Sequence, residues 1–350
     1  MKSVFLLSLL FFPFSAFGQS IPTIHIQADK NKTFNLSEIA AQIQPVSLEM
    51  NQANHFDCIS DVLWTNKYLF ISVYSLELNE RLPTRVLQYE PSGKYIREIG
   101  EQGINIWELM CDTIKNLLFI PKGKEVRSYD FEGKLKDTYL LKDHPGLYDK
   151  GYFWIHHAVP QQNEMHYSLV GYDVQTKKEE VFFEYVDSSL KYENVLVGRP
   201  ACFTFRGQTP VVSFGLDNKL YQIMEKKLTP IVEFIIDPAP SVLEKIVPVG
   251  VQGFIGNFLC IHYFKNRQKH LYMKNMVSGK IFQTKFSSSQ ENTLTDGIKD
   301  DMLSTGFCDI TPLNRPGYFY FIKKREELNN NPNISDKKAD FTLFFVKLKP

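Results

Sequence analysis

The chain has 350 residues, a length that suits one large β domain or two average domains. Lysine and arginine total 40 and aspartate and glutamate total 39, so the formal net charge is +1. This balance gives no long-range attraction to nucleic acid or to an anionic membrane, and we expect neither as a partner. Phenylalanine (28) and tyrosine (17) are abundant. Because aromatic residues suit half-buried pleated surfaces, the composition favours an all-β chain.

Residues 1–18 have the pattern of a cleavable signal peptide. A positive end precedes the apolar run Val4–Phe12, and small residues precede a cut that would leave Gln19 first. The apolar run is too short to span a membrane, and no later run approaches that length. We therefore predict an exported protein, periplasmic or extracellular, in which residues 19–350 form a single domain without a transmembrane segment.

Two short segments near the start of the mature chain predict strands, Thr23–Ile26 and Pro45–Glu49. Between them, Leu36–Ile43 predicts a short helix with Asn35 or Ser37 as its N-cap, since short polar side chains accept hydrogen bonds from the first free amides of a helix. Both strands precede the first complete repeat of the chain, so either is available to pair elsewhere.

The chain then repeats a unit of four short strands. The strands of the first unit are Ile59–Trp64, Tyr68–Val73, Arg85–Glu90 and Tyr95–Ile99. Pro91–Lys94 joins the last two strands and has the chemistry of a tight hairpin turn. Phe131–Lys134 is the corresponding turn of the second unit, whose strands are Leu109–Asp112, Leu117–Ile120, Glu125–Asp130 and Leu135–Leu140. Four antiparallel strands joined by short turns make one blade of a β-propeller.

Four more units continue the pattern. The third unit has Tyr152–His157, Met165–Asp173 and Glu179–Tyr185. The fourth has Ala201–Phe205, Val211–Phe214, Lys219–Met224 and Thr229–Ile236. The fifth has Val249–Phe254, Phe258–Phe264, His270–Asn275 and Lys280–Phe286. The sixth supplies only Gly306–Ile310, Tyr318–Lys323 and Phe341–Leu348. Within it, we interpret Lys323–Arg325 as a solvated strand end and Glu326–Asp340 as a long polar loop.

The sixth unit lacks one strand, and the start of the chain can supply it. Either Thr23–Ile26 or Pro45–Glu49 could pair with the C-terminal strand Phe341–Leu348. Closure of the ring removes the free sheet edges that invite aggregation. The sequence therefore predicts an all-β, six-bladed β-propeller closed by pairing of its N-terminal and C-terminal strands.

The five cysteines, Cys58, Cys111, Cys202, Cys260 and Cys308, form no CxxC pair. The sequence therefore contains no zinc-knuckle or thioredoxin-like motif. Export permits disulfides, but the wide spacing identifies no particular pair. We interpret the cysteines as small, buried, apolar side chains.

The repeat and the two ends of the chain resemble the six-bladed β-propeller family of exported Bacteroidetes-type proteins, which is related to NHL-repeat propellers. The segments that carry the resemblance are Phe34–Ile39, Pro45–Glu49, Leu87–Gly100, Tyr129–Lys134 and Phe344–Lys349. The resemblance covers nearly all of the mature chain and implies the fold, but it implies no established reaction. After Gly100 the family often has a Gly- and Pro-rich loop that ends in Glu-Tyr, whereas this chain has Glu101–Trp107. No function of that loop is therefore transferred.

Histidines from two blades are candidate metal ligands. His156 and His157 end a strand of the third unit, and His262 lies near the end of the corresponding strand of the fifth. Imidazoles that meet over a channel mouth can hold a divalent cation. Neighbouring residues on a strand point to opposite faces, so only one of His156 and His157 could reach such a site. The alternative is that these histidines are hydrogen-bonded within packed sheets and that the protein has no cofactor.

The segments that precede the innermost strands supply the other candidate binding residues, Asp57, Trp107, Glu108, Arg199 and Asp301. In a propeller such segments converge at one mouth of the central channel. An aromatic ring beside carboxylates and an arginine suits a sugar or a peptide, because the ring stacks on apolar ligand surfaces while the charges orient polar groups. The alternative is a set of solvated loops in which Trp107 packs between blades.

No GxSxG elbow, P-loop or HExxH motif occurs in the chain. We therefore lean towards a protein that is not an enzyme: a monomeric binding or scaffold propeller that recognises a glycan, a peptide or an envelope protein at one face of the channel. The alternative function is a metal-assisted hydrolase or lyase that uses His262, one of His156 and His157, and an acidic loop residue.

Overall fold

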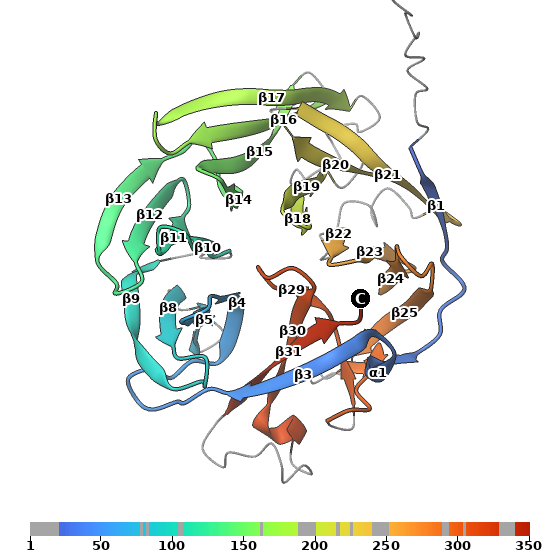
Figure 1. The fold of residues 1–350 in the computed structure, drawn as a ribbon, viewed down its shortest axis with the longest axis horizontal. Coiled ribbons are helices and arrows are strands. Elements are labelled where there is room, and N and C mark those ends of the chain that lie inside the picture. Colours follow the sequence, from blue (N-terminus) through green and yellow to red (C-terminus); the bar gives the residue numbers. More distant parts are fainter. Residues whose placement is uncertain are drawn as a thin grey trace, which may run out of the picture.

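The computed structural model describes residues 21–77, 80–81, 84–103, 108–161, 164–187, 201–214, 218–224, 227–239, 252–288, 294–303, 306–328 and 340–350. Within these residues, six sheets of four or five strands are arranged radially around a common centre (Figure 1). The predicted all-β, six-bladed propeller is therefore confirmed. Two smaller sheets, one of three strands and one of two, complete the described sheet structure.

The first three blades each contain four antiparallel strands, which follow one another in chain order from the centre outwards. Blade one consists of β4 (Cys58–Trp64), β5 (Leu69–Tyr74), β8 (Thr84–Tyr89) and β9 (Tyr95–Gly103). Blade two consists of β10 (Met110–Asp112), β11 (Leu117–Lys122), β12 (Glu125–Asp130) and β13 (Leu135–Leu140). Blade three consists of β14 (Pro145–Asp149), β15 (Tyr152–Gln161), β16 (Glu164–Asp173) and β17 (Lys178–Asp187). The sequence pattern did not identify β14.

The last three blades follow the same order, with extra strands at their outer edges. Blade four consists of β18 (Cys202–Arg206), β19 (Thr209–Ser213), β20 (Lys219–Met224), β21 (Lys227–Asp237) and β1 (Thr23–Gln27). Blade five consists of β22 (Gln252–Ile255), β23 (Phe258–Lys265), β24 (Gln268–Asn275), β25 (Ile281–Ser288) and β26 (Leu294–Asp296). Blade six consists of β29 (Thr311–Pro312), β30 (Tyr318–Lys324), β31 (Phe341–Leu348) and β3 (Ala40–Ser47).

The remaining elements are short. The three-stranded sheet contains β2 (Phe34–Asn35), β27 (Ile298–Lys299) and β28 (Phe307–Cys308). The two-stranded sheet contains β6 (Leu76–Glu77) and β7 (Glu80–Arg81). The helical elements among the described residues are α1 (Leu36–Ile39) and the 3-10 helix η2 (Arg325–Leu328).

The N-terminal segment runs along the outside of three blades (Figure 1). Strand β1 pairs in parallel with β21 of blade four, β2 pairs with β27, and β3 pairs antiparallel with β31 of blade six. Of the two strands predicted to close the ring, the one near Pro45 does so. The strand at Thr23 instead covers the outer edge of blade four, because its alternating Ile24 and Ile26 are buried against that blade.

The structure corrects two other expectations near these strands. Helix α1 is one turn long, because from Ala40 the backbone is extended and joins the closing strand; Asn35 is its N-cap, and the Asn35 amide donates to Glu38 Oε1 at 3.1 Å. In blade six, Gly306–Ile310 is not the innermost strand. Residues 307–308 pair with β27, and the two residues of β29 occupy the centre.

In the described part of the chain, six hydrophobic clusters hold the blades together, and one lies at each interface between adjacent blades. Phe119 and Phe153, for example, pack edge to face across the interface between blades two and three, with ring centroids 5.1 Å apart. Removing one such buried ring generally costs about 3–5 kcal/mol. The radial arrangement is therefore maintained by aromatic packing between the faces of neighbouring sheets.

The closing strand also depends on the hairpin turn that the sequence singled out. Gly93 has φ +91, and a Cβ atom there would lie 2.0 Å from the Ser47 carbonyl oxygen at the end of β3. The Gly93 carbonyl accepts a hydrogen bond from the Glu49 amide at 2.8 Å. Glycine is therefore needed both for the turn conformation and for the close approach of the N-terminal segment.

All five cysteines have free thiols in the structure. Among the described residues, no helix has the length and apolar character needed to cross a bilayer.

Candidate functional site

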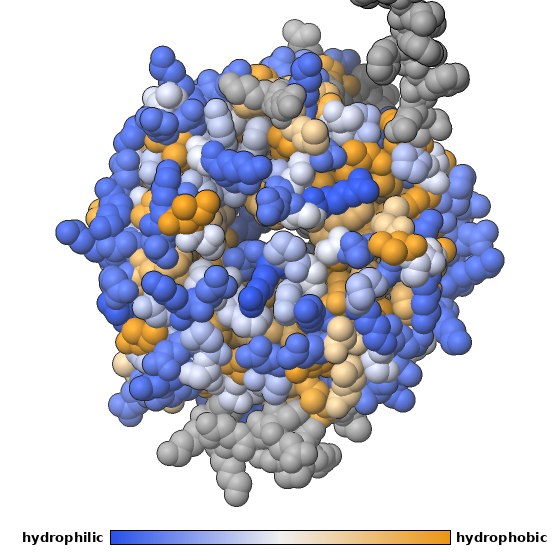
Figure 2. Space-filling view, in the orientation of Figure 1, coloured by the Kyte–Doolittle hydropathy of each residue, from blue (hydrophilic) through white to orange (hydrophobic). Residues whose placement is uncertain are grey.

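The innermost strands surround a cavity that opens where each of them turns into the second strand of its blade. We call this end of the channel the hairpin mouth. The cavity has a volume of about 560 Å³ and is lined by residues of all six blades, among them Leu63, Ile114, Lys150, Phe203, Gly256 and Arg315. Figure 2, drawn along the same axis as Figure 1, shows the molecule hollowed where the blades converge.

The turn of blade six places an arginine in the wall of this cavity. Asn314 accepts a hydrogen bond from the Trp64 amide at 2.8 Å and donates to the Trp64 carbonyl at 3.1 Å, which ties blade six to blade one. The next residue, Arg315, lies with its guanidinium 4.5 Å from the Trp64 ring centroid and 5.1 Å from that of Tyr318. Such cation–π contacts orient a guanidinium without using its N–H donors.

A second tie joins blades two and three at the same mouth. Asp112 Oδ2 accepts a hydrogen bond from the Tyr148 hydroxyl at 2.8 Å, and its Oδ1 accepts from the amides of Ile114 (3.0 Å) and Lys115 (2.9 Å). Burial and the adjacent carboxylate raise the pKa of Tyr148, so the phenol remains a donor. Protein donors therefore occupy both oxygens of Asp112.

Glycines allow the blades to approach closely around the cavity. A Cβ atom on Gly146 of blade three would lie 2.5 Å from the ring of Phe203 in blade four. A Cβ atom on Gly256 of blade five would lie 2.8 Å from the Cα atom of Gly317 in blade six. The walls are therefore fixed by inter-blade contacts before any ligand enters, as is usual for small-molecule sites.

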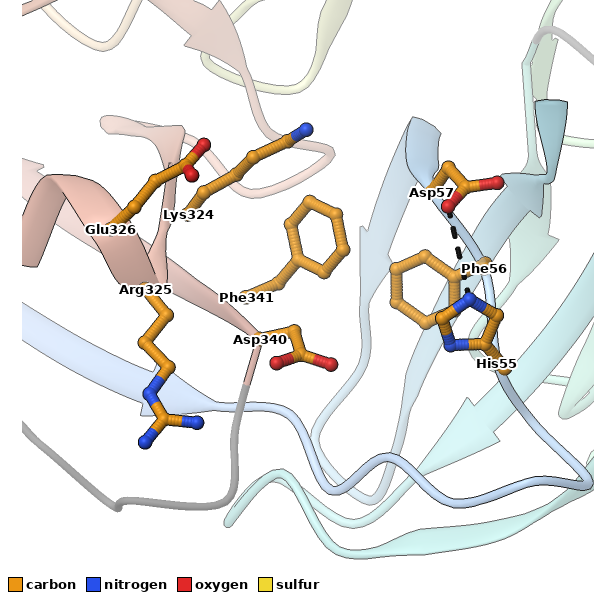
Figure 3. Close-up of a pocket in the computed structure, with 8 residues that line it drawn as sticks. All are labelled: His55, Phe56, Asp57, Lys324, Arg325, Glu326, Asp340 and Phe341. Carbon is orange, nitrogen blue, oxygen red and sulfur yellow. Dashed lines mark ion pairs between the residues drawn. The ribbon is translucent and has the colours of Figure 1, made fainter.

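A smaller pocket of about 420 Å³ lies between blades six and one, where β30 ends and the segment before β4 runs. Figure 3 shows His55, Phe56 and Asp57 on one side, and Lys324, Glu326 and Phe341 on the other. The rings of Phe56 and Phe341 stack at 5.0 Å, and Nε2 of His55 lies 3.8 Å from a carboxylate oxygen of Asp57. This pocket mixes both signs of charge around a single pair of phenyl rings.

A family model described as a 6-bladed beta-propeller matches residues 19–312. The chain belongs to this family. The match covers most of the chain and agrees with the blades seen in the structure.

Solved structures similar to this member of the 6-bladed beta-propeller family show the fold alone. One is a Bacteroides fragilis protein whose name proposes that it is exported: it is 13% identical, with a TM-score of 0.61, over 95% of this chain and all of that one. Two further matches have TM-scores of 0.42 and 0.38. The first is the CNH domain of AfRom2, which is 8% identical and covers 88% of this chain and 100% of its own. The second is a Bacteroides fragilis protein whose name proposes a 6-phosphogluconolactonase; it is 9% identical and covers 87% of this chain and 98% of its own. The last two are too distant to carry an argument. No curated protein matches the chain.

Two of the predicted binding residues, Asp57 and Glu108, precede the innermost strands of blades one and two and are not among the residues that line the larger cavity. Asp57 lines the smaller pocket, and its carboxylate accepts a hydrogen bond from the Leu76 amide at 2.8 Å. Glu108 precedes the innermost strand of blade two, as predicted. The Glu108 side chain is exposed, but the surrounding protein partly desolvates its carboxyl group. This desolvation and the nearby Asp61 carboxylate raise the pKa of Glu108 to about 8. Asp61 itself accepts a hydrogen bond from the Leu109 amide at 2.6 Å.

His156 and His157 have separate environments in this propeller. The His156 ring stacks on Tyr167 with centroids 5.5 Å apart and lies 5.4 Å from the ring of Phe214, and burial lowers its pKa to about 4. His157 Nδ1 lies 3.2 Å from a carboxylate oxygen of Asp143. His156 is therefore a neutral ring packed between blades three and four, whereas His157 pairs with a loop carboxylate.

His262 is fully buried, and its Nε2 lies 3.2 Å from Asp309 Oδ1, while Lys269 Nζ lies 2.5 Å from Asp309 Oδ2. Burial lowers the pKa of His262, and the two facing basic groups hold that of Asp309 well below its usual range. The carboxylate precedes β29, so the trio ties blade five to blade six. Across the described ranges, no group of three or more His, Cys, Asp or Glu side chains is placed to hold a metal ion.

Asp301 acts far from the channel: its carboxylate accepts hydrogen bonds from the Ser37 amide (2.9 Å) and hydroxyl (2.6 Å) at the start of α1. Trp107 and Arg199 lie outside the described residues. The structure thus does not bring Asp57 and Asp301 together, and neither Asp57 nor Glu108 lines the larger cavity, although Leu109, the residue after Glu108, does.

The residues that line the larger cavity were not among the sequence-predicted candidates. Arg315 and Lys150 belong to turns that join the first and second strands of their blades. Lys150 has φ 47, a left-handed conformation that is uncommon for a residue other than glycine. A basic residue directly before glycine in a two-residue turn is the sequence signal that could have identified Lys150.

Proposed function

We propose that this chain is an exported propeller without catalytic activity that binds a small ligand in the cavity at the hairpin mouth. The observation that carries the proposal is the cavity of about 560 Å³, to which every blade contributes residues. Its size lies within the range typical of ligand pockets, and apolar walls with a few polar groups are the usual composition of such sites. A short glycan or peptide, or the end of a partner protein's chain, would fit the same description.

Export is the other part of the proposal. The family match begins at residue 19, immediately after the predicted cleavage point. A structural relative carries a name that proposes export. When the full chain is produced in a Gram-negative bacterium, we expect the mature protein outside the cytoplasm with Gln19 as its first residue. Intact-mass measurement of the envelope fraction tests this expectation, and a full-length chain in the cytoplasm would contradict it.

A plugging variant tests the binding proposal. Gln208 is exposed and lines the cavity, so Gln208→Trp should fill part of the mouth without disturbing the core. Asn66→Trp is the matched control: it adds the same ring to an exposed turn of blade one on the same side, outside the cavity lining. Glycan, peptide and metabolite libraries are screened by thermal shift against the wild type and both variants. Hits that Gln208→Trp removes and Asn66→Trp retains support the proposal, whereas hits unaffected by either variant place binding elsewhere.

A further inference from the structure

The turns at the hairpin mouth carry more basic than acidic side chains. Lys150 and Arg315 line the cavity. Arg206 stands at its edge, with its guanidinium 5.2 Å from the centroid of the lining residue Phe254. Asp112 and Asp149 are the two carboxylates of the lining. The printed lining thus holds two basic and two acidic side chains, and Arg206 adds a further positive charge at its edge.

The two carboxylates differ from the basic groups in how far the protein already engages them. Both oxygens of Asp112 already accept hydrogen bonds from Tyr148, Ile114 and an adjacent amide. Asp149 is partly buried beside Lys150. Arg315 and Lys150 are the basic groups of the lining that can face a ligand.

Arg315 is the best-placed of these groups. Within the described part of the chain, no carboxylate pairs with its guanidinium, which lies against the rings of Trp64 and Tyr318 instead. Stacking fixes the plane of the guanidinium and leaves the edge, where the N–H donors are, available. A planar fork of this kind suits the two oxygens of a carboxylate or a related anion.

The apolar part of the cavity lies beside these cations. Ile114 is 91% exposed at its rim, which is unusual for so apolar a side chain. Leu147, Phe203 and Leu313 continue the apolar lining from three other blades. An exposed apolar surface next to oriented cations matches a molecule that has both an apolar body and an anionic group.

We infer that the ligand of the hairpin mouth is an amphipathic anion, whose acidic group binds Arg315 and whose apolar body packs on Ile114 and the neighbouring apolar side chains. This inference rests on the proposed function and specifies the class of ligand. It assigns no role to the smaller pocket between blades six and one.

Two fluorescent probes of similar shape separate charge from apolar contact. 1-Anilinonaphthalene-8-sulfonate carries a sulfonate, and N-phenyl-1-naphthylamine is its neutral counterpart. Binding of each is titrated against the folded wild type, Arg315→Gln, Ile114→Ser and Gln208→Trp. Arg325→Gln is the matched control, because it removes an equal charge from the smaller pocket. Thermal melts confirm that every variant is folded.

Arg315→Gln should weaken binding of the sulfonate about tenfold, the usual effect of losing a hydrogen bond to a charged group, and should change binding of the neutral probe less than about twofold. Ile114→Ser should weaken both probes, and Arg325→Gln should weaken neither. If Gln208→Trp blocks both probes but Arg315→Gln affects them equally, the cavity binds ligands and the inference about the anion is wrong. If Gln208→Trp affects neither probe, the proposed function itself fails.

Discussion

Lys323→Met should be strongly destabilising, because Lys323 forms a buried ion pair. Lys323 Nζ lies 2.9 Å from Asp300 Oδ2, and the two side chains are only 3% and 0% exposed. Asp300 Oδ1 also accepts hydrogen bonds from the amides of Met302 (3.3 Å) and Leu303 (3.2 Å). The substitution removes the cation that faces this buried carboxylate, and breaking a buried ion pair in this way generally costs about 3–5 kcal/mol.

Urea denaturation measures this loss as a shift of the unfolding midpoint. With an m-value of about 3 kcal/mol/M, a loss of this size lowers the midpoint by about 1–1.7 M. Lys324→Met is the control, because Lys324 is the next residue on the same strand and is exposed. Its free energy of unfolding should change by less than about 0.5 kcal/mol.

A double variant tests the cause of the effect. Lys323→Met combined with Asp300→Asn removes both charges and keeps an oxygen that can accept the hydrogen bonds of the neighbouring amides. It should recover more than half of the lost midpoint, since the penalty comes from an unpaired charge rather than from the absence of the pair. A single variant as stable as the wild type, or a double variant no more stable than the single one, would refute this reasoning.

Three other predictions concern the channel and the closure. Glu108 is exposed, but desolvation by the surrounding protein and the nearby Asp61 carboxylate raise its pKa to about 8. The stability that its protonated form provides is therefore complete below about pH 4.5 and lost as pH rises through 8. Between pH 5 and 9, the melting temperature of Glu108→Gln should therefore fall less than that of the wild type. Equal falls in the melting temperatures of the two proteins would contradict this prediction. Gly256→Val should lower the melting temperature more than Gly279→Val. Both glycines have positive φ, but only a Cβ atom on Gly256 would lie within 3 Å of backbone. Equal losses of melting temperature would show that this close approach does not contribute to stability. Val46→Asp places a charge in the buried part of the closing strand and should cost about 3 kcal/mol or more in urea denaturation, an expectation that an unchanged midpoint would refute.

Most of the blade strands could be predicted, because alternating polarity and turn residues are local signals. The exceptions are the strands whose pairing depends on distant parts of the chain. Strand β14 (Pro145–Asp149) contains a proline and a glycine and reads as a turn, but in the ring it pairs with β15. Strand β29 has two residues, too few for any periodicity. Only the arrangement of six sheets around one centre makes these segments strands.

Charge patterns were less informative than apolar patterns, as Lys323 illustrates. The run Lys323–Arg325 predicts a solvated strand end, and Lys324 is indeed exposed. Lys323 is instead buried, because consecutive residues of β30 point to opposite faces and its partner Asp300 comes from a segment 23 residues earlier in the chain. No local feature of the sequence distinguishes the paired lysine from its solvated neighbour.

The candidate site could not be predicted for a related reason. The segments before the innermost strands were chosen because they converge at one mouth, and this topological argument holds equally for the turns at the other mouth. Which mouth has room for a ligand depends on side-chain volume and on contacts between blades. Asn314 reaches Trp64 across 250 positions of sequence, and such a contact leaves no trace in either segment alone.

The structure separates the residues that maintain the fold from those that define the hairpin mouth. The six apolar clusters lie between the sheets, whereas Lys150, Arg315 and Ile114 lie on or next to turns at the ends of strands. Substitutions at these three positions should therefore change ligand preference at little cost in stability. Asn314 and Asp112 are different, because they join the turns of adjacent blades. Their loss should alter the shape of the cavity, and with it the affinity for charged and neutral probes alike.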